Sequence, residues 1–268
     1  MSSSFLPDPW QRLAALTTAR IALGRCGSSL PTGAVLRFDV AHALARDAVH
    51  LALDISGLAA RWHDLGGATA LRVRSRAGDR LTYLQRPDLG RRLDDDSAAR
   101  LAGQAGEFDL AIVLADGLSA PAAHGHALPV VLALRPLLAG LRIAPLVLAE
   151  QGRVALGDEI GCLLGARLVL VLLGERPGLS APDSLGAYLT YAPRVGRLDA
   201  ERNCVSNIRA EGLSPVAAAH KLAWLIGAAL AGKMTGVALK DESEMPLSEA
   251  LAERQPAPVT QGGNTSAG

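Results

Sequence analysis

The sequence predicts an α/β fold, with a mainly parallel, Rossmann-like sheet flanked by helices and a mostly helical amino-terminal lobe. Over residues 106–240, short apolar runs alternate with amphipathic stretches, as in a parallel sheet covered by helices on both faces. The runs DLAIVLA, IAPLVLA and RLVLVLL predict buried strands, and residues 122–140 and 155–165 predict the helices between them, which makes a βαβαβ unit. GAYLTY is expected to add a strand. A final helix is expected to begin after Ser214 and end near Gly236.

Residues 1–105 are expected to form the amino-terminal lobe, which includes a small hairpin. Asp8 can cap a first helix, Pro9 suits its first position, and Gly24 is a suitable stop. Residues 33–65 continue with apolar side chains near helical spacing. LRVRS and RLTYL then flank RAGD, which predicts two antiparallel strands joined by a turn. At the other end, residues 241–268 are polar and rich in Pro, Gly and Ser, which predicts a disordered tail.

The composition excludes several functional classes. The chain has 268 residues, of which 49% are apolar and 20% charged, and its net charge is +1. The basic residues are spread along the chain, so neither nucleic acid nor an anionic membrane is an expected partner. Cys26, Cys162 and Cys204 form no CxxC pair, which favours a reducing compartment, and so the cytoplasm, over a disulfide framework or a zinc site. We also expect no membrane span and no signal peptide, because no apolar run is long enough and the first residues lack a basic head.

A ligand-binding face is expected where three glycine-bearing loops follow the strands, at residues 116–121, 150–159 and 174–184. In an open parallel sheet, ligands bind beyond the carboxyl ends of the strands, because loops converge there and helix amino termini point outward. Glycine allows the backbone to approach a ligand closely, and Arg and Glu supply hydrogen-bonding groups. Strand-to-helix loops are commonly polar and rich in glycine, so the prediction rests on the three loops together.

Other motifs add no chemistry. Residues 227–234 have GxxxxGK spacing, but Met234 replaces the Ser or Thr that binds magnesium, and the stretch ends a helix, so a phosphate loop is rejected. His124 and His126 have no Cys or acidic partner at ligand spacing, and we predict no metal site. GxGxxG and GxSxG motifs are absent, which argues against a nicotinamide dehydrogenase and an α/β hydrolase. LDDDS fits a helix amino terminus. Cys204, taken alone, is interpreted as a small apolar side chain.

Five segments carry a resemblance to a known family. RPDLGRRL, DGLSA, QGRVALGDEIGCLLGA, GERPGLSAPDSLGAYLTYAPR and ERNCVSNIR resemble, in this order, the small (light) subunit of ethanolamine ammonia-lyase. The similarity extends over roughly residues 13–240. Five motifs in the correct order are far more specific than any one glycine-rich loop.

The resemblance implies a lyase that converts ethanolamine to acetaldehyde and ammonia by a radical route with adenosylcobalamin, whose cobalt is the only metal expected. It further implies that a large subunit, a TIM barrel, carries the substrate site, and that this chain is active only with it. The family's cofactor contacts fall on Val154, Glu175 and Cys204. We expect Val154 to touch the corrin, Glu175 to accept a hydrogen bond from a corrin amide and Cys204 to form a small wall. None of the three is expected to be a catalytic acid, base or nucleophile.

Two alternatives stay open at this point. One is a noncatalytic scaffold subunit without direct cobalamin contact, and the other is an independent Rossmann-like enzyme for small molecules. Location within a bacterial microcompartment is also open. Some family members carry a longer amino-terminal extension linked to packaging, whereas this chain reaches the TTARIALGR segment almost at once.

Overall fold

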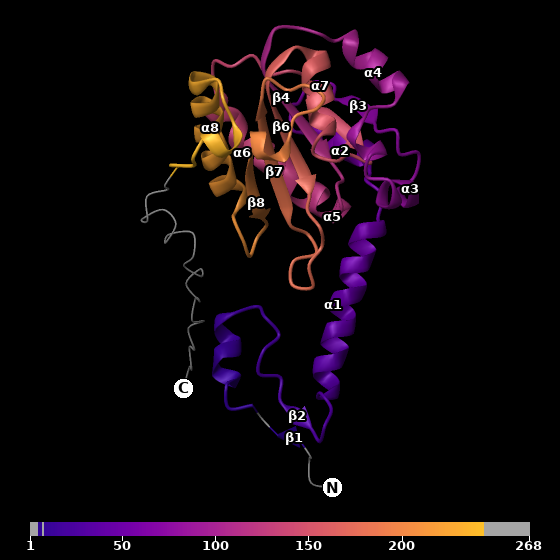
Figure 1. Cartoon of the computed structure of the whole chain (residues 1–268), viewed down its shortest axis with the longest axis vertical. Coiled ribbons are helices and arrows are strands. Elements are labelled where there is room, and N and C mark those ends of the chain that lie inside the picture. The colour runs from indigo at the N-terminus through magenta and orange to yellow at the C-terminus, as the bar shows by residue number, and fades with distance from the viewer. Residues whose placement is uncertain (1–4, 7, 244–268) are drawn as a thin grey trace, which may run out of the picture.

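The centre of the molecule is a six-stranded sheet with the order β3-β5-β4-β6-β7-β8 (Figure 1). The structure, a computed structural model, describes Phe5, Leu6 and residues 8–243. The sheet strands are β3 (Leu71–Arg74), β4 (Phe108–Ala115), β5 (Val147–Glu150), β6 (Ala166–Gly174), β7 (Leu185–Tyr191) and β8 (Arg202–Ile208). The first four in spatial order run parallel, whereas β7 and β8 are antiparallel to their neighbours. The α/β class is confirmed, but the predicted mainly parallel, Rossmann-like sheet holds only in part because the sheet is mixed.

The three apolar runs do form strands, and the predicted βαβαβ unit is confirmed. The helix between β5 and β6 is α7 (Leu156–Leu164). Between β4 and β5 the chain is helical from Ala120 to Leu138. It forms α5 (Ala120–Ala122), the π-helix η3 (Ala123–Ala127), α6 (Leu128–Leu134) and the 3-10 helix η4 (Arg135–Leu138).

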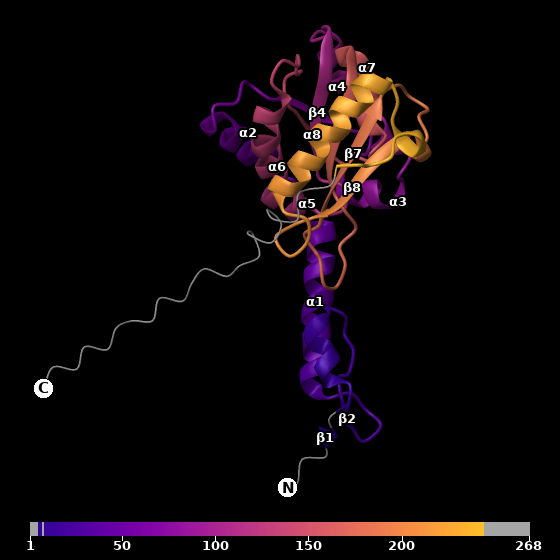
Figure 2. The same cartoon turned by 90° about the vertical axis from the view of Figure 1, so that its left-hand side faces the viewer.

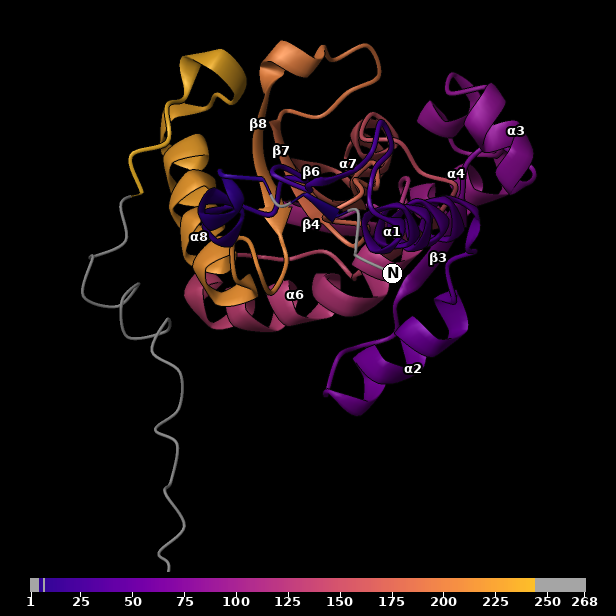
Figure 3. The same ribbon diagram turned by 90° about the horizontal axis from the view of Figure 1, so that it is seen from below.

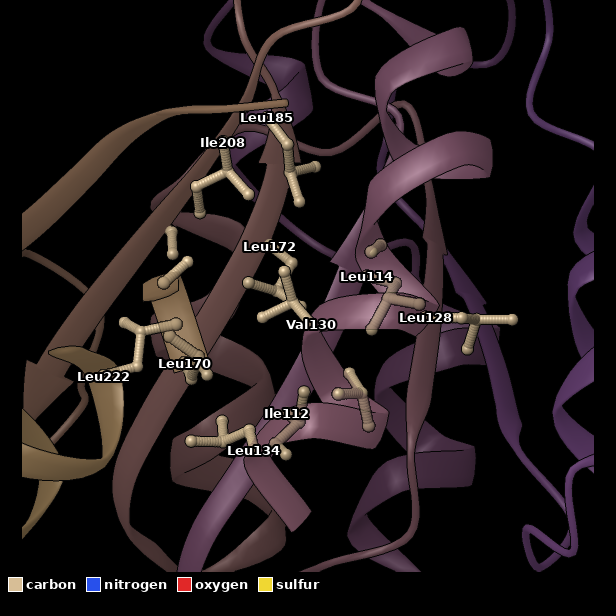
Figure 4. Packing of buried hydrophobic residues seen from close by; sticks show 14 of the residues in the cluster. Ile112, Leu114, Leu128, Val130, Leu134, Leu170, Leu172, Leu185, Ile208 and Leu222 are labelled. Carbon is tan, nitrogen blue, oxygen red and sulfur yellow. The ribbon is translucent and has the colours of Figure 1, made fainter. Parts of the chain in front are cut away.

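Both faces of the sheet are covered, because side chains alternate between the two sides of a strand. Leu110, Ile112 and Leu114 of β4 point to one face, in a cluster with residues of α6, α8 (Pro215–Gly232) and α2 (Ile55–Asp64). Figure 4 shows Ile112 and Leu114 in this cluster with Leu128 of α6 and Leu222 of α8. Ala111 and Val113 point to the other face, which is covered by α4 (Asp95–Ala102) and α7. Seen from below, α6 and α7 lie on opposite sides of the sheet (Figure 3).

The last described long helix, α8, begins as predicted. The Ser214 side chain accepts a hydrogen bond from the Ala217 amide at 3.2 Å, and Pro215 occupies the first turn. The helix ends at Gly232, slightly earlier than expected. Within residues 8–243, α8 alone is long and apolar enough to cross a membrane by length and composition. About a third of it is buried in the structure, including Leu222 and Ile226, which belong to the core cluster.

The amino-terminal part differs from its prediction in two elements. The predicted helix after Asp8 is only a 3-10 helix, η1 (Gln11–Leu16), without a side-chain cap, since Asp8 accepts from the Trp10 amide instead. The short strands β1 (Phe5–Leu6) and β2 (Arg25–Cys26) pair on either side of it. The helical pattern over residues 33–65 is confirmed as α1 (Thr32–His50) and α2. Figures 1 and 2 show α1 projecting from the α/β body.

The predicted hairpin is wrong. LRVRS does form a strand, β3, but it pairs in parallel with β5 at the edge of the main sheet. RLTYL forms the helix α3 (Arg80–Gln85), because Asp79 caps it by accepting from the Thr82 amide at 2.9 Å, and Tyr83 is fully buried on its inner side. The β-forming residues Thr82 and Tyr83 misled the prediction, and burial and capping decided the structure. Most of the predicted tail, residues 244–268, lies outside the described residues.

Candidate functional site

The three glycine-bearing loops converge at the carboxyl edge of the parallel strands, as predicted. Leu118, after β4, donates its amide hydrogen to the carbonyl oxygen of Gly174 at 2.9 Å. The Ser119 hydroxyl donates to the carbonyl oxygen of Pro182 at 2.8 Å. The Asp116 carboxylate accepts from the amides of Gln151 and Gly152, both at 3.0 Å. The three loops therefore form one continuous rim, and this rim faces α1 (Figure 1).

Asp116 is the most deeply buried charge of the rim, with 1% of its surface exposed. Besides the two amides, it accepts a hydrogen bond from Arg80 of α3 at 3.1 Å. Burial raises the pKa of Asp116 to about 6, and the charge of Arg80 and the amides limit that rise. Ionising this buried carboxylate costs free energy, yet it binds the amides of Gln151 and Gly152. This indicates that Asp116 positions the loop after β5.

Glu175 follows β6 and is fixed by one of its two oxygens. Oε2 accepts from the Ser184 hydroxyl at 2.5 Å and from the Asn207 amide at 3.2 Å. Oε1 lies beside Gly186 of β7, where an added Cβ would come within 3.0 Å of it. Among the residues that the structure describes, Oε1 has no hydrogen-bonding donor. Glu175 therefore presents one anchored oxygen and one oxygen that can accept a further hydrogen bond.

Tyr188 and Cys204 continue the same wall across β7 and β8. The two residues are direct cross-strand partners. Burial raises the pKa of the Tyr188 hydroxyl, and the nearby Cys204 and Glu175 raise it further. Although the Cys204 side chain is exposed, desolvation and Glu175 also raise the pKa of its thiol. Both groups are neutral near pH 7, so this part of the wall offers polarizable, uncharged contacts.

Val154 belongs to the same face of the sheet. It is half-buried and packs against the cluster that also receives Tyr188. A pocket of about 390 Å³ opens at this place, lined by Arg153, Glu175 and Tyr188 together with Tyr83, Leu118, Leu173, Gly174 and Arg176. Of the predicted contact residues, Glu175 lines the pocket directly. Val154 is next to a lining residue in sequence, and Cys204 is paired with one.

A buried ion pair anchors β8 behind this wall. Arg202 of β8 donates to both carboxylate oxygens of Asp158 on α7, at 2.6 and 2.7 Å, and also to the Thr190 hydroxyl at 3.0 Å. Only 2% and 1% of the two charged side chains are exposed. Bidentate pairing of this kind fixes orientation as well as distance. It therefore fixes the strand that carries Cys204 against the helix that follows Val154.

Sequence reasoning missed three side chains of the rim, namely Arg80, Tyr83 and Tyr188. Arg80 and Tyr83 lie on α3, which the sequence pattern assigned to a strand. Tyr188 was placed in a strand but not in the site. Its signal is the GAYLTY alternation, which puts Gly186, Tyr188 and Thr190 on one face and the core side chains on the other.

The two histidines of the HGH motif have ordinary partners. His124 Nε2 accepts from the Asp54 amide at 2.9 Å, and His126 lies 3.3 Å from Asp183. Within residues 8–243, no group of three or more His, Cys, Asp and Glu side chains has the geometry to hold a metal ion.

Fold and rim together define the class of the molecule: an α/β protein whose candidate site is an open wall, and whose 19-residue helix α1 stands away from the body. Sequence comparison then gives the family. The model of the ethanolamine ammonia-lyase light chain matches residues 7–240, and the chain belongs to this family.

Curated relatives agree over nearly the whole length. The chain is 56% identical over 257 residues to the ethanolamine ammonia-lyase small subunit of Xanthomonas campestris pv. campestris, covering 94% of both chains. It is 58% identical over 246 residues to that of Pseudomonas putida, covering 89% of this chain and 90% of the relative. It is 56% identical over 249 residues to that of Ralstonia nicotianae, covering 91% and 92%.

Proposed function

We propose that this chain, a small subunit of ethanolamine ammonia-lyase, forms one wall of an adenosylcobalamin site that a large subunit completes. The observation that carries the proposal is the rim around Glu175, where an unpaired carboxylate oxygen, an exposed thiol and an open pocket lie on one face. The complex is proposed to convert ethanolamine to acetaldehyde and ammonia. The chain itself supplies no catalytic group.

The side chains of the rim suit a corrinoid ligand. A cobalamin is a broad, mostly apolar ring edged with neutral amide side chains, so it needs flat apolar contact and a few hydrogen-bond acceptors. Val154 would supply the apolar contact and Glu175 Oε1 the acceptor for an amide N–H, while Cys204 would bring the wall close without a charge. A pocket of about 390 Å³ accommodates only part of such a molecule, which supports a site shared with a second polypeptide.

The chemistry divides between cofactor and protein. When bound, the cobalamin supplies the weak carbon–cobalt bond from which radical chemistry starts. The residues of this chain would hold the ring in orientation and keep water away from the reacting centre. The raised pKa values of Tyr188 and Cys204 suit this task, because neither group would carry charge against the ring.

The exposed surface of α1 supports the proposal that a second polypeptide binds this chain. Of its 19 residues only Ala34 and Ala48 are buried, while Leu36, Val40 and Leu44 are 59%, 60% and 55% exposed. Apolar residues at this i, i+4, i+8 spacing form one stripe along a helix. An apolar stripe of this kind marks a protein contact more often than free surface. We propose that α1 packs on the large subunit, which in the family resemblance is a TIM barrel.

The complex is proposed to work in the cytoplasm. Cys26, Cys162 and Cys204 are all free thiols in the structure, as expected in a reducing compartment.

The test is to coexpress the chain with its large subunit and measure acetaldehyde and ammonia from ethanolamine. We expect equal amounts of both products, formed only when both subunits and adenosylcobalamin are present. Activity of the isolated chain would instead support an independent enzyme, and activity without cobalamin would refute the proposed cofactor.

A further inference from the structure

Arg80 of α3 links three parts of the chain that are distant in sequence. Its Nε donates to the Val49 carbonyl oxygen in the last turn of α1 at 2.6 Å. Its Nη1 donates to Asp116 at 3.1 Å and to the Gln151 side chain at 3.4 Å. The side chain is only 12% exposed. One guanidinium therefore joins the exposed helix, the loop after β4 and the loop after β5.

The loop after β5 needs such a restraint. Gln151 has φ +55°, a left-handed conformation that is unfavourable for residues other than glycine. The amides of Gln151 and Gly152 both donate to Asp116, which Arg80 holds in place. Gly152 lies so close to the sheet that an added Cβ would come within 3.0 Å of the Ala115 Cβ. The strained turn thus depends on Asp116 and sets the direction in which the next residues leave the sheet.

Tyr83, one turn after Arg80 on α3, restrains the same loop from the side. Its hydroxyl donates to the Gly152 carbonyl oxygen at 2.9 Å. The guanidinium of Arg153 lies 4.2 Å from the centre of its ring, and that of Arg80 lies 4.8 Å from it. Cation–π contact with Tyr83 also explains how Arg80 Nη2 and Arg153 Nε are buried without a hydrogen-bond partner among the described residues.

We propose that Arg80 is a positioning residue for the cofactor wall: through Asp116 it holds the strained 151–154 loop so that Val154 is presented at the rim, and through Val49 it ties that loop to α1. The inference rests on the proposed function, because the loop matters to the reaction only if cobalamin lies against it.

The charge arrangement supports a positional role over a stabilising one. Burial raises the pKa of Asp116, so its ionised form is disfavoured in the fold. The groups that face this carboxylate are Arg80 and Tyr83 of α3 and the amides of Gly117, Gln151 and Gly152. A neutral side chain would be easier to bury here. What the carboxylate adds is an acceptor for both loop amides and a partner for Arg80.

The test compares Arg80→Met with Arg167→Met in the full chain. Arg167 pairs with Asp109 at 3.1 Å near the opposite edge of the sheet, so this control loses an ion pair without touching the rim. Hydrogen exchange of the segment 150–155 is measured in the free chain. Adenosylcobalamin affinity is measured by absorbance in the complex with the large subunit. Arg80→Lys, which keeps the charge but not the forked geometry, answers the same question if Arg80→Met fails to fold.

We expect exchange in 150–155 to become roughly tenfold faster in Arg80→Met, with less change in β4 and β6, because the loop loses its restraint while the core remains. Cobalamin is expected to bind about tenfold more weakly, because Val154 is no longer held at the rim. Arg167→Met should change neither the exchange of 150–155 nor the cobalamin affinity. Arg80→Lys should give values of both between those of wild type and Arg80→Met. If the wild-type complex binds cobalamin and Arg80→Met binds it equally well, the inference is overturned while the proposed function stands. A wild-type complex that binds no cobalamin overturns both.

Discussion

Tyr188 on β7 and Cys204 on β8 face each other across the antiparallel half of the sheet, and the pKa of each is raised by burial. Their pairing extends the candidate site beyond the carboxyl edge of the parallel strands, where ligand sites of α/β sheets are usually expected. The raised pKa also argues against Cys204 as a nucleophile, because its thiol is largely protonated near pH 7.

Cobalamin should protect Cys204 from alkylation. Iodoacetamide would modify both exposed thiols, Cys204 and Cys162, slowly in the free chain. In the complex with adenosylcobalamin we expect modification of Cys204 to slow severalfold, because the corrin covers it, and modification of Cys162 on α7 to change less. Mass spectrometry of the two peptides measures both rates in one sample. Equal rates with and without cofactor would place the cobalamin elsewhere.

Glu175→Ala should weaken cobalamin binding and leave turnover at saturating cofactor nearly unchanged. A hydrogen bond to a charged group contributes about 1.5–3 kcal/mol, or roughly ten- to hundredfold in the dissociation constant. Glu175→Gln should weaken binding as well. Ser184 and Asn207 both donate to this side chain, so they would select the amide oxygen and turn the NH₂ group toward the corrin.

The control for Glu175 is Glu211→Ala. Glu211 is a mostly exposed carboxylate near the end of β8, paired with Arg209. Its loss should not alter cofactor affinity. If Glu175→Gln bound cobalamin as tightly as wild type, the acceptor role of Oε1 would be wrong.

Charge placed on α1 should weaken the complex with the large subunit. In Val40→Glu and Leu44→Glu, a carboxylate replaces an exposed apolar side chain, so folding of the free chain should be little affected. Burial of that carboxylate against a partner would be costly, and we expect association to weaken at least about tenfold. Arg46→Glu, in which the replaced side chain is exposed and polar, is the matched control. Copurification with a tagged large subunit measures the difference, and unaltered recovery of Val40→Glu would exclude this stripe from the interface.

The parallel half of the fold could be predicted because its signal is local. Continuous apolar runs such as DLAIVLA are buried on both faces, and the helices between them show their own period. The same logic placed the three loops on one edge, and the structure confirms that Asp116 contacts the loop after β5 and that Leu118 contacts Gly174. The direction of β7 and the existence of β8 had no such signal. Strand pairing depends on partners distant in sequence.

The apolar spacing in α1 predicted the helix but did not show that this face of it is exposed. Leu36, Val40 and Leu44 have the spacing of a core-facing helix, but each is more than half exposed, and together they border an open hollow that Arg20 and Pro182 of the same chain also line. Periodicity reports that a face is apolar and does not say which molecule covers it. In the same way, Arg80 could not be assigned to the rim, because its partners Val49, Asp116 and Gln151 are brought together only by the fold.

Asp116 should make the protein less stable as pH rises. Its pKa is about 6 in the fold against 3.8 as the reference value, so the folded state binds the proton more tightly than the unfolded chain does. The protonated carboxyl therefore adds to the free energy of unfolding below about pH 4, and this contribution is lost as the pH rises through 6. The difference of about two pKa units corresponds to about 3 kcal/mol. Wild type should therefore lose stability relative to Asp116→Asn between pH 4 and 7, as measured by urea unfolding.

Asp109 is the control for this pH dependence, because its pKa is shifted the other way. The Arg142 amide and the neighbouring arginines lower the pKa of Asp109, although desolvation opposes them. Its contribution is present above the unfolded pKa and is lost as pH falls through the lower folded value. Below pH 4, the free energy of unfolding of wild type should therefore fall relative to that of Asp109→Asn as the pH is lowered, which is the opposite direction to Asp116. If the difference in unfolding free energy between wild type and Asp116→Asn stayed constant across pH 4–7, the raised pKa of Asp116 would be wrong.

The most direct test of the shared wall is the dissociation constant of adenosylcobalamin for the assembled complex with wild-type or Cys204→Trp small subunit, measured by absorbance titration. Cys204 is exposed, so the larger ring should be tolerated by the fold while it occupies the space in front of the wall. We expect an intact complex whose cobalamin affinity is lower by tenfold or more, an apparent loss of about 1.4 kcal/mol or greater. An intact complex that binds cobalamin as tightly as wild type would contradict the account and favour a scaffold subunit without cofactor contact.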